Sequence, residues 1–304
     1  MNLIDIIVVG AGPAGMTAAL YALRANKTVT VIEKETIGGQ IAQSPRLENY
    51  PSIVSISGNE FADQLFEQIS DLGANLEIDE ILSIEKKEDY FILQGDSDTY
   101  YAKAVILATG VKHRIIGAIN EENLIGSGIS YCATCDGPFF KGQEVAVIGD
   151  ANSALQYTIA LAGYCSKVYI CTLFDHFFGD QQLVNRVKEL NNVDIIHNVS
   201  LKEFIGNESL EALRFENTNS KEELVLKVNG VFVAIGQVPN NEAFNNLVDL
   251  DEKGYFNSNE SCLTKTEGLF VAGDCRVKSV RQVATAIADG AVAATLAVEY
   301  INRK

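Results

Sequence analysis

The sequence predicts an α/β fold in which two three-layer domains share one architecture and the second domain is inserted in the first. Residues 5–33 alternate strand, glycine turn, helix and strand, written DIIVV, GAGPAG, MTAALYALRAN and TVTVIE. The same order returns at residues 144–171, written EVAVIG, DANSA, LQYTIALAGYC and KVYIC. Each copy later runs an apolar strand into a glycine, at Gly110 and at Gly236. This repeat indicates two Rossmann-like nucleotide-binding modules.

The segment after Gly236 predicts how the two modules are connected. It contains the strand-like run GLFVAGDC and the long helical run RQVATAIADGAVAATLAVEYI, but no βαβ unit of its own. We therefore expect this tail to return and complete the first module. The predicted domains are residues 1–115 with 239–304, and residues 116–238.

Composition narrows the classes of function. The chain has 24 Lys and Arg against 40 Asp and Glu, a net charge of −16, which disfavours nucleic-acid binding because phosphates need a basic face. Glycines and Pro13 interrupt the uncharged residues 6–23, and no basic stretch precedes them, so we expect neither a signal peptide nor a membrane segment. The prediction is a cytoplasmic protein in which four of the six cysteines are buried thiols.

The first glycine turn predicts a dinucleotide site. Gly10, Gly12 and Gly15 allow a tight turn, close backbone approach to a pyrophosphate and close helix packing, and the helix amides attract the phosphates. Glu33 ends the second strand, where its carboxylate can accept hydrogen bonds from ribose hydroxyls. A glycine-rich turn that serves only packing is the alternative.

A pair of cysteines predicts redox chemistry. Cys132 and Cys135 lie in SYCATCDG, a spacing typical of half a zinc site or of a redox pair with an activated thiolate. There is no second CxxC, and the three histidines lack metal-ligand spacing, so we expect no metal. Asp136 follows the pair and is the candidate proton donor and acceptor. A turn aspartate beside Gly137 is the alternative interpretation.

Together these motifs resemble the low-molecular-weight flavin-dependent thioredoxin reductases along nearly the whole chain. GAGPAG, IGGQI, LENYP, ATG, CATCDG, VAIGQVPN, FVAGDC and RQVATA occur in that family's order. The resemblance implies FAD as the prosthetic group, thioredoxin as the substrate and a homodimer. It further implies that Cys135 faces the flavin, that Cys132 attacks the thioredoxin disulfide through a mixed disulfide, and that Asp136 is the acid.

The same resemblance implies a set of FAD-binding residues from both ends of the chain. They are Gly10, Gly12, Pro13, Ala14, Gly15, Glu33, Lys34, Gly39, Gln40, Asn49, Thr109, Gly110, Gly273, Asp274, Arg281, Gln282 and Val283. In this picture Asp274 lies next to the ribityl chain or a phosphate, and Gln282 approaches the isoalloxazine ring. An exposed helix start is the alternative for Arg281 and Gln282.

The second module departs from the family where NADPH would bind. Its turn reads GDANSA, so Ala151 places a methyl group where a glycine would admit a pyrophosphate, and Asp150 adds negative charge. The arginine-bearing HRR segment of the family is replaced by CTLFDHFFGD. Each lost charge-assisted hydrogen bond contributes about 1.5 to 3 kcal/mol, which predicts weak NADPH binding. NADH does not rescue the site easily, because no acidic residue ends the strand at 169–172. Asp175, which lies further along the chain, is the alternative partner for a ribose hydroxyl.

The aromatic residues of this segment have two interpretations. We expect Phe174, Phe177 and Phe178 to fill the vacated groove as core. A protein-docking patch is the alternative.

These losses resemble the ferredoxin-dependent branch of the family. An iron–sulfur donor with a reduction potential of about −400 mV reduces a disulfide whose couple lies at about −270 mV, and roughly 6 kcal/mol is released per electron pair. The sequence therefore predicts that two reduced ferredoxins supply FAD, which reduces the cysteine pair. The candidate local cations for an acidic ferredoxin form two groups, Arg276, Lys278 and Arg281 in one and Lys112, His113 and Arg114 in the other. Solvated surface charge is the alternative for each of them. The alternatives are an NAD(P)H-dependent disulfide reductase with an altered groove and a flavin redox sensor without turnover.

Overall fold

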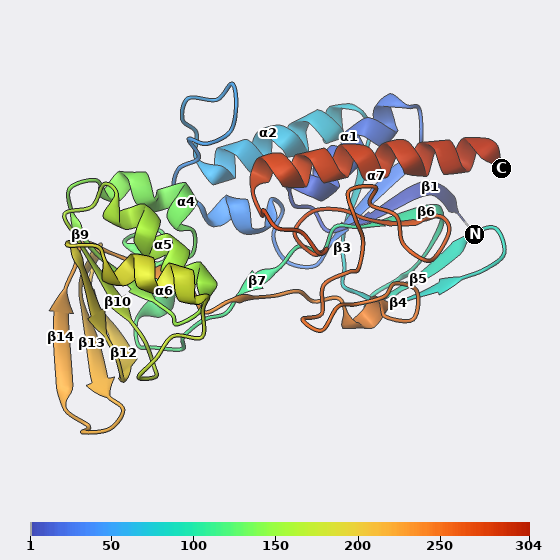
Figure 1. Ribbon diagram of the computed structural model, residues 1–304. Coiled ribbons are helices and arrows are strands. Elements are labelled where there is room, and N and C mark those ends of the chain that lie inside the picture. Colours follow the sequence, from blue (N-terminus) through green and yellow to red (C-terminus); the bar gives the residue numbers. More distant parts are fainter. Residues whose placement is uncertain (1) are drawn as a thin grey trace. The chain divides into compact units, whose positions relative to one another are not determined.

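The computed structural model describes residues 2–304 and contains two compact units (Figure 1). One unit comprises Met1–Lys112 and Val238–Lys304, and the other comprises His113–Gln237. The two chain connections carry the short strands β7 (Lys112–His113) and β16 (Gln237–Val238), which pair with each other. The inserted unit therefore begins and ends at neighbouring points, where the Gln237 side chain lies 3.4 Å from His113 Nδ1.

A mixed sheet of seven strands forms the centre of the first unit. Its strands are β1 (Leu3–Val9), β2 (Val29–Glu33), β3 (Asn75–Ile78), β4 (Ile81–Lys86), β5 (Phe91–Gly95), β6 (Thr99–Leu107) and β17 (Leu269–Val271). The strands β3, β2, β1 and β6 are parallel neighbours in that order. Along one edge of β6, the first half pairs with antiparallel β5 and the last three residues pair with parallel β17. The C-terminal tail thus supplies a strand to the sheet that the N-terminal residues begin.

Helices cover one face of this sheet. The helical elements are α1 (Pro13–Arg24), η1 (Gly39–Gln43), α2 (Gly58–Asp71), η3 (Glu242–Phe244) and α7 (Val283–Arg303). Figure 1 shows α1, α2 and α7 side by side over the sheet. Small residues let α1 and α7 approach closely, and a Cβ at Gly290 would lie only 2.2 Å from Ala14 O. A second hydrophobic core joins side chains of the sheet, including β4 and β5, to the segment around Phe244 and Phe256.

By length and composition alone, α7 is one described helix that is apolar enough to cross a membrane. Its small-residue face, with Ala293, Ala294 and Ala297, is buried in the core that α1 and β1 share. Core helices of folded domains pass the same test, and this packing gives α7 that role.

The second unit has a parallel sheet in the order β11-β10-β9-β15-β8 and a separate antiparallel sheet β12-β13-β14. Its strands are β8 (Ile129–Ser130), β9 (Glu144–Ile148), β10 (Lys167–Cys171), β11 (Val193–Ile196), β12 (Val199–Gly206), β13 (Leu210–Asn217), β14 (Glu223–Lys227) and β15 (Gly230–Val233). Its helices are α3 (Glu121–Leu124), α4 (Ala133–Asp136), η2 (Gly137–Phe140), α5 (Asn152–Ala162) and α6 (Gln181–Lys188). Leu155 and Val184 bring α5 and α6 onto one face of the parallel sheet, and Phe204 and Phe215 of the antiparallel sheet cover the other. The predicted α/β fold class is confirmed.

Candidate functional site

The first glycine turn is a cradle of bare backbone at the carboxyl end of β1. Gly10 has a φ of +108°, and a Cβ there would lie 2.3 Å from Ala108 O. A Cβ at Gly15 would lie 1.9 Å from Gly10 O, so this glycine allows α1 to pack against the turn. Gly12 differs, because a Cβ there would meet nothing closer than Gly38 O at 3.9 Å. The open space is therefore at Gly12, just before α1, whose first turn lacks both a side-chain cap and an acidic residue.

Glu33, at the end of β2, holds this turn through its carboxylate. Its Oε2 accepts a hydrogen bond from Ala11 N at 2.8 Å, and its Oε1 accepts one from Glu35 N at 2.9 Å. Each carboxylate oxygen has a second lone pair, so these bonds leave acceptor sites for ribose hydroxyls. The carboxylate stiffens the glycine turn in addition to its expected ligand role.

Asp274 follows β17 and carries an unsatisfied buried atom. Its Oδ1 is buried and has no hydrogen-bond partner in the described structure. Burial raises the pKa of Asp274 to about 6, although Lys278 and Arg281 act in the opposite direction. An orphaned buried carboxylate oxygen indicates a missing hydrogen-bond donor, and a ribityl hydroxyl of FAD would supply one.

Several other predicted FAD residues contact this region of the first unit. Gly39 lies near Gly12, Gln40 donates to Val111 O, Thr109 Oγ1 bonds to Asn241 Oδ1 at 2.8 Å, and Asn49 Nδ2 donates to Gln282 Oε1 at 3.0 Å. A Cβ at Gly273 would lie 2.8 Å from Ala14 Cβ, so Gly273 lets β17 end beside α1. The open cradle, the uncapped helix and the orphaned carboxylate fit FAD.

Five of the predicted residues are engaged elsewhere or lie at element boundaries. Lys34 pairs with Glu80 at 2.8 Å on the surface. Arg281 stacks on Tyr255 at 4.3 Å and donates to backbone carbonyls, including Asp274 O. Gln282 caps α7, whose first residue is Val283, and Gly110 adopts a φ of +65° with open space around it. Arg281 therefore braces the loop around Asp274, whereas Gln282 caps α7 and accepts a hydrogen bond from Asn49, and both side chains are partly buried.

A buried ion cluster that the sequence analysis did not anticipate supports the same loop. Asp289 of α7 accepts from Gly273 N at 3.0 Å, from Arg276 at 2.7 and 2.8 Å, and from Lys278 at 2.9 Å. The only sequence signal for it is a charged residue within the small-residue stripe IADGAVAA. Asn241 was missed as well, and its amide donates to Gly254 O and Cys275 O.

In the second unit the two cysteines form the predicted pair. Cys132 and Cys135 are joined by a disulfide, and the remaining four cysteines are buried free thiols, as expected. Cys132 caps α4, with its Sγ 3.2 Å from Cys135 N. Asp136 ends α4; its Oδ2 accepts from Ser130 Oγ at 2.6 Å, and its Oδ1 is buried without a partner. Burial raises the pKa of Asp136, as a proton donor near neutral pH requires, and the Ser130 hydrogen bond lowers it in part.

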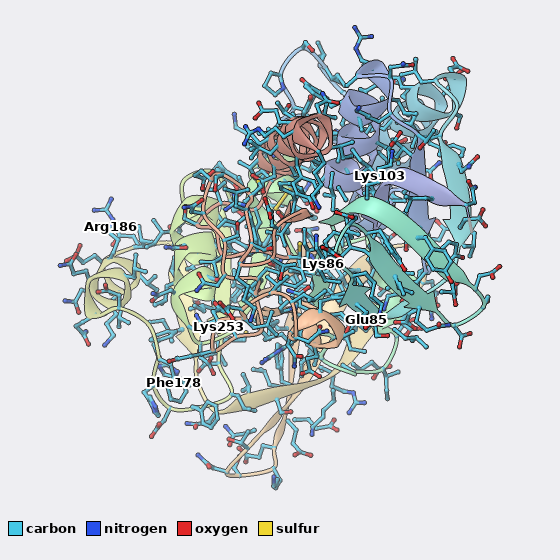
Figure 2. The ribbon with its side chains drawn as sticks, turned by 90° about the vertical axis from the view of Figure 1, so that its right-hand side faces the viewer. Glu85, Lys86, Lys103, Phe178, Arg186 and Lys253 are labelled. Atoms are coloured by element: carbon cyan, nitrogen blue, oxygen red, sulfur yellow. A yellow bond between two sulfur atoms is a disulfide. The ribbon has the colours of Figure 1, made fainter. Side chains whose placement is uncertain are left out.

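The loop after β10 lies against the second glycine turn. Phe178 N donates to Asp150 O, and Asp180 N donates to Asn152 Oδ1, both at 2.7 Å. Phe177 is partly buried and packs on His197. The expectation of core filling is wrong for the other two phenylalanines, because Phe174 is 45% exposed and Phe178 is 59% exposed. Figure 2 shows Phe178 at the periphery of the molecule. The rings of Phe174 and Phe178 contact each other and His176 instead.

Most of the proposed docking cations already have partners. Arg276 is 1% exposed and Lys278 is nearly as buried, both on Asp289. Lys112 pairs with Glu35, and burial lowers the pKa of His113 to about 4, so that ring is neutral. The expectation that these side chains form cationic patches is therefore wrong for Arg276, Lys278 and His113. Lys112 and Arg114 are both solvent-exposed, and Lys112 is paired with the exposed Glu35.

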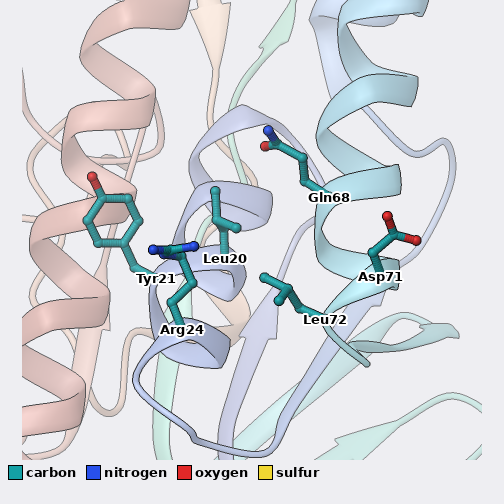
Figure 3. Close-up of a pocket in the computed structure, with 6 residues that line it drawn as sticks. All are labelled: Leu20, Tyr21, Arg24, Gln68, Asp71 and Leu72. Atoms are coloured by element: carbon teal, nitrogen blue, oxygen red, sulfur yellow. The ribbon is translucent and has the colours of Figure 1, made fainter.

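One surface groove of the described structure lies away from these features. It has a volume of about 630 Å³ and lies between α1 and α2 (Figure 3), lined by Leu20, Tyr21, Arg24, Gln68, Asp71 and Leu72. It contains no cysteine, histidine or orphaned carboxylate. The groove therefore does not alter the assignment of the site.

Comparisons with known proteins agree with this geometry. The family described as pyridine nucleotide-disulphide oxidoreductase matches residues 4–290. The thioredoxin reductase of Bacillus subtilis is 39% identical over 304 residues, covering 98% of this chain and 95% of that protein. The thioredoxin reductase structure from Streptococcus pyogenes aligns with a TM-score of 0.96 at 34% identity, over 99% of both chains.

A ferredoxin-flavin thioredoxin reductase from Clostridium acetobutylicum aligns with a TM-score of 0.54 at 30% identity, also over 99% of both chains. The chain therefore belongs to the pyridine nucleotide-disulphide oxidoreductase family, as an FAD-dependent thioredoxin reductase.

Proposed function

We propose that this thioredoxin reductase takes its electrons from reduced ferredoxin instead of NAD(P)H, and that Cys132 and Cys135 pass them to thioredoxin. The observation that carries the proposal is the chemistry of the loop after β10. Leu173, Phe174 and Phe178 present apolar surface to solvent where the family resemblance would place cations for a 2′-phosphate. No Lys or Arg occurs at residues 149–154 or 172–180.

The glycine turn beneath the loop supports the same conclusion. Ala151 occupies the position that must admit a pyrophosphate, and Asp150 is an anion next to it. The backbone oxygen of Asp150 and the side chain of Asn152 are already bonded to the loop. A dinucleotide phosphate would find no Lys or Arg in this turn or loop with which to form an ion pair. The likeness to the Clostridium acetobutylicum ferredoxin-flavin enzyme adds support.

The chemistry of the cysteine pair then follows from this chain's own residues. FAD, when bound, accepts single electrons and delivers them as a pair. Two electrons and two protons convert the Cys132–Cys135 disulfide to two thiols. The Cys132 thiolate attacks the thioredoxin disulfide to form a mixed disulfide, which the Cys135 thiolate resolves, leaving thioredoxin reduced and the enzyme disulfide restored. Cys135 N–H points at Cys132 Sγ, and a donated hydrogen bond stabilises a thiolate there.

The experiment that tests the donor is anaerobic reduction of the bound flavin. We expect rapid bleaching by reduced ferredoxin, and no bleaching by micromolar NADPH or NADH. Adding oxidised thioredoxin and titrating its thiols should show many turnovers per enzyme. Rapid bleaching by either nucleotide would overturn the proposal, and flavin reduction without thioredoxin turnover would indicate a redox sensor.

A matched variant tests the loop directly. Phe178→Arg returns one cation to the exposed loop, and it should strengthen NADPH binding by about tenfold to a hundredfold through a charge-assisted hydrogen bond to the 2′-phosphate. Binding of NADH, which lacks that phosphate, should stay unchanged. Phe178→Ala is the control, because it removes the ring without adding charge. From the family resemblance we also expect a cytoplasmic homodimer, which sedimentation of the purified holoenzyme would test.

A further inference from the structure

The hydroxyl of Ser130 connects the carboxylate of Asp136 to the backbone of Cys132. Ser130 Oγ donates to Asp136 Oδ2 at 2.6 Å and accepts from Cys132 N at 3.0 Å. A second acceptor, Cys132 O, lies 3.4 Å from the same hydroxyl. Ser130 itself is buried and fixed by β8, which pairs with β15 through Phe232. The family resemblance gave this serine no role, and the sequence analysis did not select it.

The two acceptors of Ser130 compete for one proton. While Asp136 is ionised, the shorter and charge-assisted bond to its carboxylate is favoured. When Asp136 is protonated, the carboxyl can donate to Ser130 Oγ, and the hydroxyl then turns toward Cys132 O. The hydrogen-bond direction of Ser130 thus follows the protonation state of Asp136, and Cys132 is bonded to the same oxygen in both states.

We propose that Ser130 is a positioning residue that sets the protonation equilibrium of Asp136 and aims its free oxygen for proton transfer during thiol exchange. This inference rests on the proposed roles of the cysteines and Asp136. The Asp136 carboxylate takes the proton of the Cys135 thiol, which frees the resolving thiolate. The resulting carboxylic acid gives that proton to the thioredoxin sulfur that is displaced from Cys132 when the mixed disulfide breaks. Two sulfur–sulfur bonds exchange, and Asp136 returns to its starting state.

Among the groups that surround Asp136, the Ser130 hydroxyl is the main polar group that affects its protonation. Tyr157 of α5 and Tyr164 beyond its end pack against the α4 and η2 segment, and burial raises the pKa of both phenols, so they stay neutral. Tyr131, beside Ser130, bonds to Glu121, and its pKa is raised by burial as well. No charged side chain adds a resolved effect on Asp136, whose pKa responds to burial and to the Ser130 bond. The cysteine thiols are the remaining titrating neighbours once the disulfide is reduced.

The test uses exchange with thioredoxin in a single turnover, with no electron donor present. The holoenzyme is reduced with dithiothreitol, freed of the reagent and mixed with oxidised thioredoxin across a range of pH. In Ser130→Ala we expect the acidic limb of the rate profile to move up by about one to two pH units, because the carboxylate loses a charge-assisted hydrogen bond. The infrared band of the protonated Asp136 carboxyl, identified by its loss in Asp136→Asn, should persist to higher pH by the same amount.

Three variants separate positioning from packing. Ser130→Thr keeps the hydroxyl and should restore the wild-type profile. Ser130→Cys keeps the volume with a weak donor and should shift the limb by an intermediate amount, which covers the case in which Ser130→Ala fails to fold. Thr158→Ala removes another buried hydroxyl, bonded to Ala154 O at 2.8 Å, and should leave the profile unmoved.

The decisive comparison is the double variant Ser130→Ala/Asp136→Asn. If Ser130 acts through Asp136, adding Ser130→Ala to Asp136→Asn causes no further shift of the profile. An unmoved acidic limb in folded Ser130→Ala, or an equal shift in the Asp136→Asn background, would overturn the proposal. Because no ferredoxin or nucleotide enters the assay, its result is independent of which donor reduces the flavin.

Discussion

Gly12 and Gly15 belong to one turn but differ in what a side chain would meet. A Cβ at Gly15 falls 1.9 Å from Gly10 O, whereas a Cβ at Gly12 falls in open space. We expect Gly15→Ala to lower the free energy of unfolding by several kcal/mol even without FAD, because the backbone must move. Gly12→Ala should change apo-protein stability by less than about 1 kcal/mol.

The same pair tests where the cofactor lies. Gly12→Ala should weaken FAD binding by at least about tenfold, since its methyl group enters the space through which a pyrophosphate approaches the backbone. Urea unfolding of the apo-protein and a flavin fluorescence titration measure the two effects. Unchanged FAD affinity in folded Gly12→Ala would remove the cofactor from this turn.

Single residues also show why the sequence predicted some positions and not others. The glycine spacing of the first turn has a steric meaning that can be inferred from the letters alone. The environment of Arg276 cannot be inferred that way, because it depends on Asp289 of α7, a helix whose position is set by its packing on α1. The exposure of Phe178 has a similar origin, since it depends on a backbone bond to Asp150.

At the scale of elements, Asp289 joins α7 to the loop after β17. Removing its charge with Asp289→Asn leaves the guanidinium of Arg276 buried and poorly compensated, which should cost about 3 to 5 kcal/mol of unfolding free energy. Glu260→Gln is the matched control, because Glu260 also pairs with Arg276 but is 89% exposed, so it should cost less than about 1 kcal/mol. Similar losses in the two variants would contradict a buried ion cluster.

The cluster also predicts how stability depends on pH. Burial alone would raise the pKa of Asp289, but hydrogen bonds from Arg276 and Lys278 outweigh it and lower the pKa below its usual range. A carboxyl whose pKa is lower in the folded state stabilises the fold at pH values above its pKa in the unfolded chain, which is about 3.9. This stabilisation is lost as the pH falls through the pKa of the folded state. Chemical denaturation is measured at a series of pH values from pH 6 downward, over about three pH units. The free energy of unfolding should fall more steeply with decreasing pH in wild type than in Asp289→Asn. Parallel curves would contradict this assignment.

At the scale of the whole molecule, the confirmed fold class came from a repeat of strand, glycine turn and helix. The antiparallel additions β4–β5 and β12–β14 were not predicted, because short strands such as Glu223–Lys227 alternate weakly between buried and exposed residues. The sequence predicts domain boundaries after residues 115 and 238, whereas the boundaries between the two units of the structure fall after Lys112 and Gln237. Both boundaries lie in β7 and β16, whose two-residue lengths leave no periodic signal.

The division into units leads to a prediction for the separated parts. The inserted unit is continuous, has its own core on both sheet faces, and begins and ends at paired strands. We therefore expect a fragment of residues 113–237 to unfold cooperatively in urea and to form the Cys132–Cys135 disulfide without binding flavin. Residues 1–112 joined to 238–304 by a short glycine-rich linker should bind FAD and remain yellow. Absorbance spectra and thiol titration of the two purified fragments measure this, and flavin retained by the inserted unit, or its failure to fold, would contradict the prediction. The result locates the cofactor in one unit and the disulfide in the other, since each fragment contains only one set of candidate residues.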